Sequence, residues 1–244
     1  MDKIGTLKTL RRYPVKSMMG EDLANAFTGF AGLAGDRVYA LVDPAKSGNF
    51  PWLSARQVPE MIRFVPRFLD PPPVTEQFPD RSRYKVEVLT PEGDRYDLED
   101  PAFHALLEKR WNRPFHLRFS ERGMQDARPI SLFGLPSLRL LEQETGMKID
   151  HRRFRANFYV EWENGLAKYE EQLLGRTLQI GEKLKVMIDK KDSRCVIINL
   201  EPADATSTPE LLKHVGKVHG GCIGVYAVTV VEGVAAAGDP VFLV

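Results

Sequence analysis

Cys195 is the residue of this chain whose type and setting are best suited to chemistry. It directly follows Arg194, after a charged segment at residues 189–193 that we predict to be a loop, and it leads into an apolar run that predicts a strand over 195–200. Neighbouring cations favour the thiolate, the form of cysteine that attacks electrophiles, carries sulfane sulfur or ligates a soft metal. An unpaired cysteine is also a common small apolar core residue. The residue alone leaves both interpretations open.

A second group of residues has the chemistry of an anion site. Cations lie beside small hydroxyls or at the ends of strand-like segments: Lys16 with Ser17, Arg37 after Asp36, Arg56 after Ser54, and Arg152, Arg153 and Arg155 around Phe154. A guanidinium matches two oxygens of a phosphate or another oxyanion at once. If the strands close into one sheet, these ends converge. The alternative is that each is a solvated surface charge.

The elements that must position these residues are mostly strands. Alternating apolar residues and turn signals predict them at 6–13, 37–43, 84–90, 95–98, 158–162, 177–180, 183–188, 195–200, 222–231 and 241–244. Helices are predicted at 101–110, with Asp100 as N-cap and Pro101 in the first position, at 136–145 before Gly146, and near 210–215. Residues 70–83 are rich in proline and charge and predict an exposed loop. The fold class is therefore mainly β with a few helices (α+β), built on a barrel or closed sheet.

Composition excludes several classes of function. The 244 residues include 34 Lys and Arg against 33 Asp and Glu, so the net charge is close to zero. The protein as a whole therefore has no electrostatic attraction to nucleic acid or to an acidic membrane. The longest apolar run, 222–231, is far shorter than the roughly 20 residues that span a bilayer. Two cysteines cannot supply the ligands of an ordinary iron–sulfur cluster, and the five histidines lack the spacings of zinc motifs, which favours surface or core roles for them. We expect a soluble, cytoplasmic protein with no nucleic-acid or membrane partner.

Seven short motifs occur in the order found in MOSC-domain proteins. They are Tyr13-Pro14-Val15-Lys16-Ser17, Gly35-Asp36-Arg37, Arg153-Phe154-Arg155-Ala156-Asn157, Leu178-Gln179-Ile180-Gly181, Ser193-Arg194-Cys195, Gly224-Val225-Tyr226 and Gly238-Asp239-Pro240-Val241. Each motif is weak alone, but the ordered set spans nearly the whole chain. The sequence resembles the MOSC family with its N-terminal companion domain, as in the mitochondrial amidoxime-reducing component and its bacterial relatives.

This resemblance implies a fold, a cofactor and a set of site residues. It implies a β-rich N-terminal domain, residues 1–98, packed against a MOSC β-barrel domain, residues 99–244. It further implies that the chain binds the molybdenum cofactor, a pterin dithiolene with a phosphate, and that Cys195 ligates the molybdenum. By the same resemblance Lys16, Ser17, Arg37 and Arg155 hold the pterin and its phosphate. We place Arg56, Asp126, Arg153 and Asn157 in the same cofactor site and Arg194 beside Cys195 in the catalytic centre.

The chain departs from the family pattern at several of these positions. Asp192 stands three residues before Cys195, where relatives often carry a cysteine, and Ile198-Asn199 replaces a threonine pair. Ala156 replaces the proline between Arg155 and Asn157, and Ala127 replaces the hydroxyl residue after Asp126. These changes predict an altered cofactor pocket, or one that is empty.

Three functions remain open at this point. The first is a molybdenum oxidoreductase that reduces N-hydroxylated or related N-oxygenated small molecules with electrons from an external donor protein. The second is a sulfur carrier or transferase in which Cys195 holds a persulfide received from a sulfur donor. The third is a cofactor-binding module without turnover.

Overall fold

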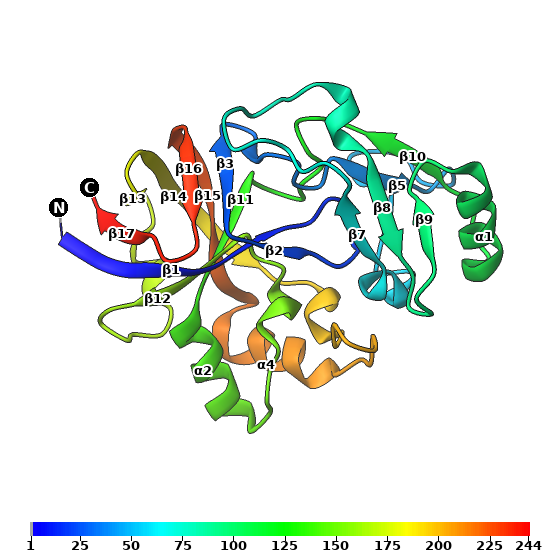
Figure 1. Cartoon of the computed structure of the whole chain (residues 1–244). Coiled ribbons are helices and arrows are strands. Elements are labelled where there is room, and N and C mark those ends of the chain that lie inside the picture. Colours follow the sequence, from blue (N-terminus) through cyan, green and yellow to red (C-terminus); the bar gives the residue numbers. More distant parts are fainter. Residues whose placement is uncertain (1) are drawn as a thin grey trace.

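The chain folds into a closed β-barrel with a second β-rich body beside it (Figure 1). The computed structural model describes residues 2–244. The first and last strands lie at the end of the barrel that is farther from the second body, and helices cover the lower side of the barrel in the view of Figure 1. No helix in the described part of the chain is both long and apolar enough to cross a membrane.

Seven strands close the barrel, and an eighth short strand extends it. In sheet order they are β1 (Asp2–Arg12), β12 (Phe158–Trp162), β11 (Ile130–Gly134), β15 (Cys222–Val231), β14 (Leu184–Ser193), β13 (Thr177–Ile180) and β17 (Pro240–Leu243), which pairs with β1 again; β2 (Glu21–Leu23) adds to β1. The pair β11–β12 is parallel and the others are antiparallel. Leucine, isoleucine and valine side chains from these strands fill the interior.

The second body consists of small antiparallel sheets around an aromatic-rich core. One sheet contains β10 (His116–Phe119), β5 (Tyr39–Val42) and β6 (Trp52–Leu53), and another contains β7 (Val65–Phe68), β8 (Val86–Leu89) and β9 (Arg95–Asp97). Helix α1 (Pro101–Trp111) and the 3-10 helices η1 (Pro59–Arg63) and η2 (Arg81–Tyr84) cover them. A third small sheet of β3 (Asn25–Gly29), β4 (Gly32–Leu33) and β16 (Gly233–Ala236) joins the chain's beginning to its end.

Helices and 3-10 turns form a third packed group below the barrel. It comprises α2 (Leu135–Thr145), α4 (Pro209–His219), η3 (His151–Phe154) and η4 (Val196–Asn199), while the short helix α3 (Tyr169–Gln172) packs against the barrel core. Leu141 of α2, Leu211 and Val215 of α4 and Ile198 of η4 share one core cluster. This packing fixes η4, and therefore the backbone beside Cys195, against the two longer helices.

Most of the predicted elements are confirmed. The strands at 158–162, 177–180 and 222–231 have the predicted limits, and α1 begins at Pro101 with the Asp100 carboxylate accepting a hydrogen bond from Ala102 N at 2.8 Å. Helix α2 ends at Gly146, which takes a left-handed conformation, as predicted for a C-cap. Helix α4 is present but longer than the segment 210–215 that the sequence predicts.

Two predictions around Cys195 are wrong. The charged residues 189–193, predicted as a loop, are the end of β14 and pair with β15 through a register that shifts three times. The apolar residues after Cys195, predicted as a strand, form the 3-10 helix η4. The reason is tertiary: the guanidinium of Arg153 donates to the carbonyl of Asn199 at 2.9 Å, and Asn199 Oδ1 accepts from Leu212 N at 2.9 Å. These bonds outweigh the β-propensity of Val196, Ile197 and Ile198.

The predicted domain division at residues 98 and 99 stays a prediction, and segments from each side of it pack into both bodies. Strand β1, from the predicted first domain, closes the barrel between β12 and β17. Helix α1 and Phe115, from the predicted second domain, pack into the core of the second body. Each predicted domain therefore contributes a segment to the other body. The candidate site residues lie at the boundary between the two bodies.

Candidate functional site

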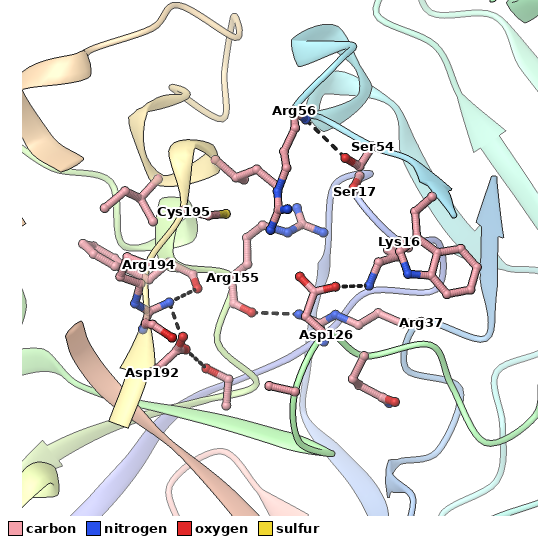
Figure 2. Close-up of a pocket in the computed structure, with 18 of the residues that line it drawn as sticks. Lys16, Ser17, Arg37, Ser54, Arg56, Asp126, Arg155, Asp192, Arg194 and Cys195 are labelled. Carbon is pink, nitrogen blue, oxygen red and sulfur yellow. Dashed lines mark hydrogen bonds and ion pairs between the residues drawn. The ribbon is translucent and has the colours of Figure 1, made fainter. Parts of the chain in front are cut away.

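A cavity of about 320 Å³ lies between the barrel and the second body. It is lined by the ten residues that the sequence analysis places in the catalytic and cofactor sites: Lys16, Ser17, Arg37, Arg56, Asp126, Arg153, Arg155, Asn157, Arg194 and Cys195. Arg152, which the sequence analysis groups with the same cations, does not line it and pairs with Asp150 instead. The close-up in Figure 2 shows Cys195 on one side of the cavity and Lys16, with Asp126, on the other, with Arg56 and Arg155 between them. The predicted convergence of distant cations and one thiol is therefore confirmed, while the role of each residue stays a prediction.

Tyr13 is the platform on which two of the cations are stacked. The guanidinium carbons of Arg37 and Arg155 each lie 4.4 Å from the centre of its ring. The Tyr13 hydroxyl donates to the Ala156 carbonyl at 3.2 Å, and Tyr13 N donates to Asp36 Oδ1 at 2.9 Å. Cation–π contact with one fixed ring holds both guanidinium groups in defined positions despite their like charge.

Arg37 and Arg155 differ in how far the protein satisfies them. Arg37 pairs with Asp36 and donates to the Arg155 carbonyl at 2.9 Å. Among residues 2–244, Arg155 has no carboxylate partner, and its Nη2 atom is buried without a hydrogen-bond partner. The pKa of Arg155 is lowered to about 10, mainly by burial; Tyr13 opposes this change and the positive charge of Arg37 contributes to it. An unsatisfied cation of this kind is an anion-binding position.

Three site residues occupy strained backbone positions. Ser17, Arg37 and Arg155 have φ angles of 68°, 52° and 51°, and they are three of six non-glycine residues with positive φ among residues 2–244. A left-handed conformation costs a residue with a Cβ roughly 1 kcal/mol or more, and such strain gathers at functional sites. Here it turns Arg155 out of η3 immediately after Phe154, so that its side chain points to the cavity rather than to the helical core.

Lys16 and Asp126 form an ion pair on the far wall of the cavity. Lys16 Nζ lies 2.5 Å from Asp126 Oδ1 and also donates to the Met124 carbonyl at 2.6 Å. Burial lowers the pKa of Lys16, against the opposing charge of Asp126, and the nearby Arg37 and Arg155 add to the lowering. Burial alone would raise the pKa of Asp126, but the charge and hydrogen bond of Lys16 and the charge of Arg37 hold it below its usual value. The pair leaves Lys16 charged but only partly neutralised.

Cys195 is a free, half-buried thiol at the junction of β14 and η4. Its carbonyl accepts from Ile198 N at 3.2 Å, which begins the 3-10 turn and fixes the backbone. Cys195 is one of the residues that line the cavity. Cys222, the other free cysteine, pairs through its backbone with Ser193 and does not line the cavity. The core interpretation of Cys195 therefore gives way to that of an accessible thiol.

Arg194 and Asp192 form a buried pair beneath Cys195. Arg194 Nη1 lies 3.1 Å from Asp192 Oδ2, and the two side chains are 5% and 4% exposed. Arg194 also donates to the carbonyls of Ile223 at 2.7 Å and Phe154 at 2.9 Å. Asp192 accepts from Ser131 Oγ at 3.0 Å. The aspartate at the family's cysteine position is thus the counter-ion of Arg194. Three of the acceptors of the Arg194 guanidinium belong to the protein, so this side chain holds the end of β14 in place while it lines the cavity.

Arg153 and Asn157 line the cavity, but both side chains form polar contacts with other parts of the protein. Arg153 donates to the Asn199 carbonyl and lies 2.8 Å from Glu201 Oε2. Asn157 Oδ1 accepts from Ser131 N at 3.1 Å, and its Nδ2 donates to the Arg11 carbonyl at 3.2 Å. Both join the barrel to the cavity floor. Their predicted contact with a cofactor would use only the remaining edges of these side chains.

Sequence reasoning missed several residues of the site. Tyr13 belongs to a quoted motif, but nothing in the sequence shows that its ring separates two arginines. Asp192 reads as a departure, whereas the structure makes it a structural partner. Phe50 and Trp52 line the cavity and add an apolar surface that no motif announces. A charged residue two positions before Arg194 was the available signal for the Asp192 pair, because β-strand periodicity places both on one face.

Comparison with known families agrees with this arrangement. Residues 120–242 match the MOSC domain, and residues 4–107 match the MOSC N-terminal beta barrel domain. The chain belongs to the MOSC-domain family. The resemblance that the ordered motifs predict is therefore confirmed, and the cavity of this MOSC protein lies where the two matched regions meet.

Comparison with solved structures finds similar chains at low sequence identity. The YUAD protein from Bacillus subtilis is 10% identical, with a TM-score of 0.50, over 97% of this chain and 93% of that one. YiiM from Geobacillus stearothermophilus is 22% identical, with a TM-score of 0.38, over 48% of this chain and 54% of that one. The MOSC chain thus spans about half the length of YiiM. Comparison with curated proteins found no match.

Proposed function

We propose that this MOSC protein binds the molybdenum cofactor and reduces N-hydroxylated or related N-oxygenated small molecules with electrons from an external donor protein. One observation carries the proposal: the accessible thiol of Cys195 and the unpartnered guanidinium of Arg155 line the same cavity of about 320 Å³. A soft sulfur ligand and a cation-rich wall match a cofactor that has a sulfur-bonded metal at one end and a phosphate at the other.

The donor set fits this cofactor group by group. Cys195 would ligate the metal, and Arg155 would bind the phosphate with the buried Nη2 atom that no protein group satisfies. Arg37 and Lys16 add positive charge but already have carboxylate partners, so they would tune the site and orient the anion. Arg56 is exposed and lines the same cavity, where it would contact the bound tail. When bound, the molybdenum centre would supply the two-electron redox chemistry.

The protein's own residues account for the remaining requirements. The Asp192–Arg194 pair and η4 hold the Cys195 backbone rigid. Phe50, which is 51% exposed, and Trp52 give the entrance an apolar surface for a small organic substrate. The reduction R–NHOH + 2H⁺ + 2e⁻ → R–NH₂ + H₂O needs electrons from outside, because two cysteines cannot hold an iron–sulfur cluster. Both cysteines are free, which is typical of a reducing compartment such as the cytoplasm, where we propose that the protein acts.

The test is the metal content of protein made in a host that synthesises the cofactor. Wild type is expected to carry molybdenum and to reduce an amidoxime with a reduced dye as electron donor. Cys195→Ala is expected to lose most of both. Cys222→Ala is the matched control, because this thiol lies outside the cavity, and it should retain both. Absence of molybdenum from wild type, or equal molybdenum in Cys195→Ala, would contradict the proposal.

A second candidate function rests on the accessibility of the same thiol. Cys195 would act as a persulfide carrier: its thiolate attacks the outer sulfur of a desulfurase persulfide, takes that sulfur and leaves the donor cysteine as a thiol. The protein is incubated with a desulfurase and cysteine and then treated with cyanide, which releases bound sulfur as thiocyanate. Thiocyanate from wild type and Cys222→Ala but not from Cys195→Ala would support this function. If molybdenum is bound through Cys195 but neither amidoxime reduction nor thiocyanate is observed, the third function, a cofactor-binding module without turnover, is the one that survives.

A further inference from the structure

A second cluster of metal-ligating side chains lies outside the cavity, between α2 and α4. Glu144 lies in the last turn of α2, while His214 and His219 belong to α4. Both imidazole Nε2 atoms contact the same carboxylate oxygen, Glu144 Oε2, at 2.8 Å from His214 and 2.7 Å from His219. Potential ligand atoms of the three side chains all lie within 4.8 Å of one another. This spacing is small enough for one ion to contact all three.

The cluster is closed on one side and open on the other. The His219 side chain is 5% exposed, whereas His214 and Glu144 are 22% and 25% exposed. His219 is the last residue of α4, and the left-handed Gly220 ends the helix there. An ion could therefore enter past Glu144 and His214, and three protein ligands would leave one position of a tetrahedral site for water. The four residues between His214 and His219 match the histidine half of a zinc-finger pattern, but the chain has no paired cysteines to complete that pattern, so only the folded chain reveals Glu144 as the third ligand.

The chemistry of the ligands selects the class of ion. Two imidazole nitrogens with one carboxylate oxygen are a common ligand set for zinc and related transition metals. Magnesium and calcium prefer ligand shells made of oxygen. We propose that Glu144, His214 and His219 bind a divalent transition metal ion, with zinc the best match. This site is separate from the proposed molybdenum cofactor site and does not depend on it.

An ion at this position would brace the wall that carries Cys195. It would join the end of α2 to the end of α4, which otherwise meet through core contacts such as that between Leu141 and Leu211. Helix α4 in turn holds η4, because Leu212 N donates to Asn199 Oδ1 and Thr208 N donates to the Asn199 carbonyl at 2.8 Å. Metal binding is therefore expected to reduce the local opening of α4 and η4 together.

Titration of zinc into chelator-treated full-length protein, followed by calorimetry, tests the site. Wild type is expected to bind one zinc ion per chain. Glu144→Gln and His219→Gln should each weaken that binding by about 100-fold or more, which exceeds the loss from an outer-shell partner. His116→Gln, an exposed histidine on β10, is the matched control and should bind zinc as wild type does. Cys195→Ser should also retain the site, which separates it from binding by the thiol.

Amide hydrogen exchange gives a readout that a merely structural salt bridge would not change. Zinc is expected to slow exchange in α4 and η4 of wild type and of His116→Gln, and to have no such effect in Glu144→Gln. Circular dichroism without zinc shows whether each variant is folded, and His214→Gln provides a third, more exposed position if one of the others unfolds. Failure of wild type to bind zinc would overturn the proposal and leave the cluster as an ion-pair network. Equal zinc binding by wild type, Glu144→Gln and His219→Gln would overturn it as well.

Discussion

The two walls of the cavity carry similar residues but differ in how completely their charges are neutralised. Beneath Cys195, Arg194 has a buried carboxylate partner and two carbonyl acceptors, so the charge of that wall is largely compensated, although Arg194 Nη2 is buried without a hydrogen-bond partner among residues 2–244. On the opposite wall Lys16 and Arg37 have carboxylate partners, but Arg155 has none. Two cations that are close in sequence, Arg153 and Arg155, fall on different sides of this division.

This difference distinguishes residues that stabilise the structure around the cavity from residues whose charge is available to bind a ligand. A buried charge with a full set of partners stabilises one arrangement of the chain, and removing a partner leaves the other charge uncompensated. A buried cation with an empty hydrogen-bonding position gains most from an incoming anion. The wall beneath Cys195 is therefore expected to respond to mutation through stability, and the opposite wall through ligand affinity.

The largest expected effect is the loss of the buried pair under Cys195. Asp192→Ala should lower the free energy of unfolding by about 3–5 kcal/mol, because the Arg194 guanidinium would remain buried without its counter-ion. Chemical denaturation measures this change. The double variant Asp192→Ala/Arg194→Met should recover much of the loss, since it removes both charges. A loss below about 1 kcal/mol would show that this wall does not depend on the pair.

The next effect is a loss of anion affinity on the opposite wall. Arg155→Met should weaken binding of sulfate, a simple oxyanion probe, by roughly 10- to 100-fold, because a hydrogen bond to a charged group contributes about 1.5–3 kcal/mol. Isothermal titration with the cofactor-free protein measures it. Methionine keeps most of the stacking surface on Tyr13, so stability should change little. Unchanged sulfate affinity would contradict the assignment of Arg155 as the anion-binding residue.

The neighbouring arginine should give the opposite pattern. Arg153→Met is expected to reduce stability by about 2–3 kcal/mol, because the Asn199 carbonyl and Glu201 lose a charged donor. Sulfate affinity of the folded variant should stay within about threefold of wild type, since the Arg153 guanidinium already has protein acceptors. Chemical denaturation measures the free energy of unfolding, and sulfate titration of the same samples measures the affinity. A large loss of affinity with unchanged stability would reverse the roles of Arg153 and Arg155.

The smallest expected effect concerns Asp126 and its dependence on pH. Asp126→Asn should tighten sulfate binding at pH 7 by a few-fold only, because the side chain is 43% exposed and solvent screens it. Lys16 and Arg37 hold the pKa of Asp126 below its ordinary value of 3.8, although burial alone would raise it. Asp126 therefore contributes stability above pH 3.8 that is lost as the pH falls through its lowered pKa in the folded state.

Titration of sulfate across pH checks this effect. The affinity difference between wild type and Asp126→Asn should persist at neutral pH and disappear when the pH falls below the folded-state pKa of Asp126. A difference that stays constant down to that pH would show that the carboxylate charge is not its cause.

The sequence predicts most of the barrel strands because they are apolar segments bounded by turn residues, but it misses β11. Strands β12, β13 and β15 have the predicted limits, and α1 starts where Asp100 and Pro101 place it. The ten site residues were identified by type, by neighbours and by ordered family motifs, and all ten line one cavity. Periodicity, turn residues and helix caps depend only on residues that are close in the sequence. These local signals are sufficient to predict such elements.

The remaining features depend on contacts between distant segments. No local signal shows that Asn199 and Arg153 force residues 196–199 into a 3-10 turn, or that β1 closes the barrel against β12 and β17. The left-handed backbone of Arg37 and Arg155 is imposed by bonds to Tyr13 and to η3, not by their residue type. The pairing of Glu144 with His219 joins residues 75 positions apart. Such contacts are properties of the folded chain.

X-ray absorption at the molybdenum edge tests the central claim, ligation by Cys195, most directly. Wild-type protein loaded with the cofactor is expected to show one more sulfur neighbour around molybdenum than Cys195→Ser, while Cys222→Ser matches wild type. An identical sulfur shell in wild type and Cys195→Ser would contradict the claim that this thiol holds the metal.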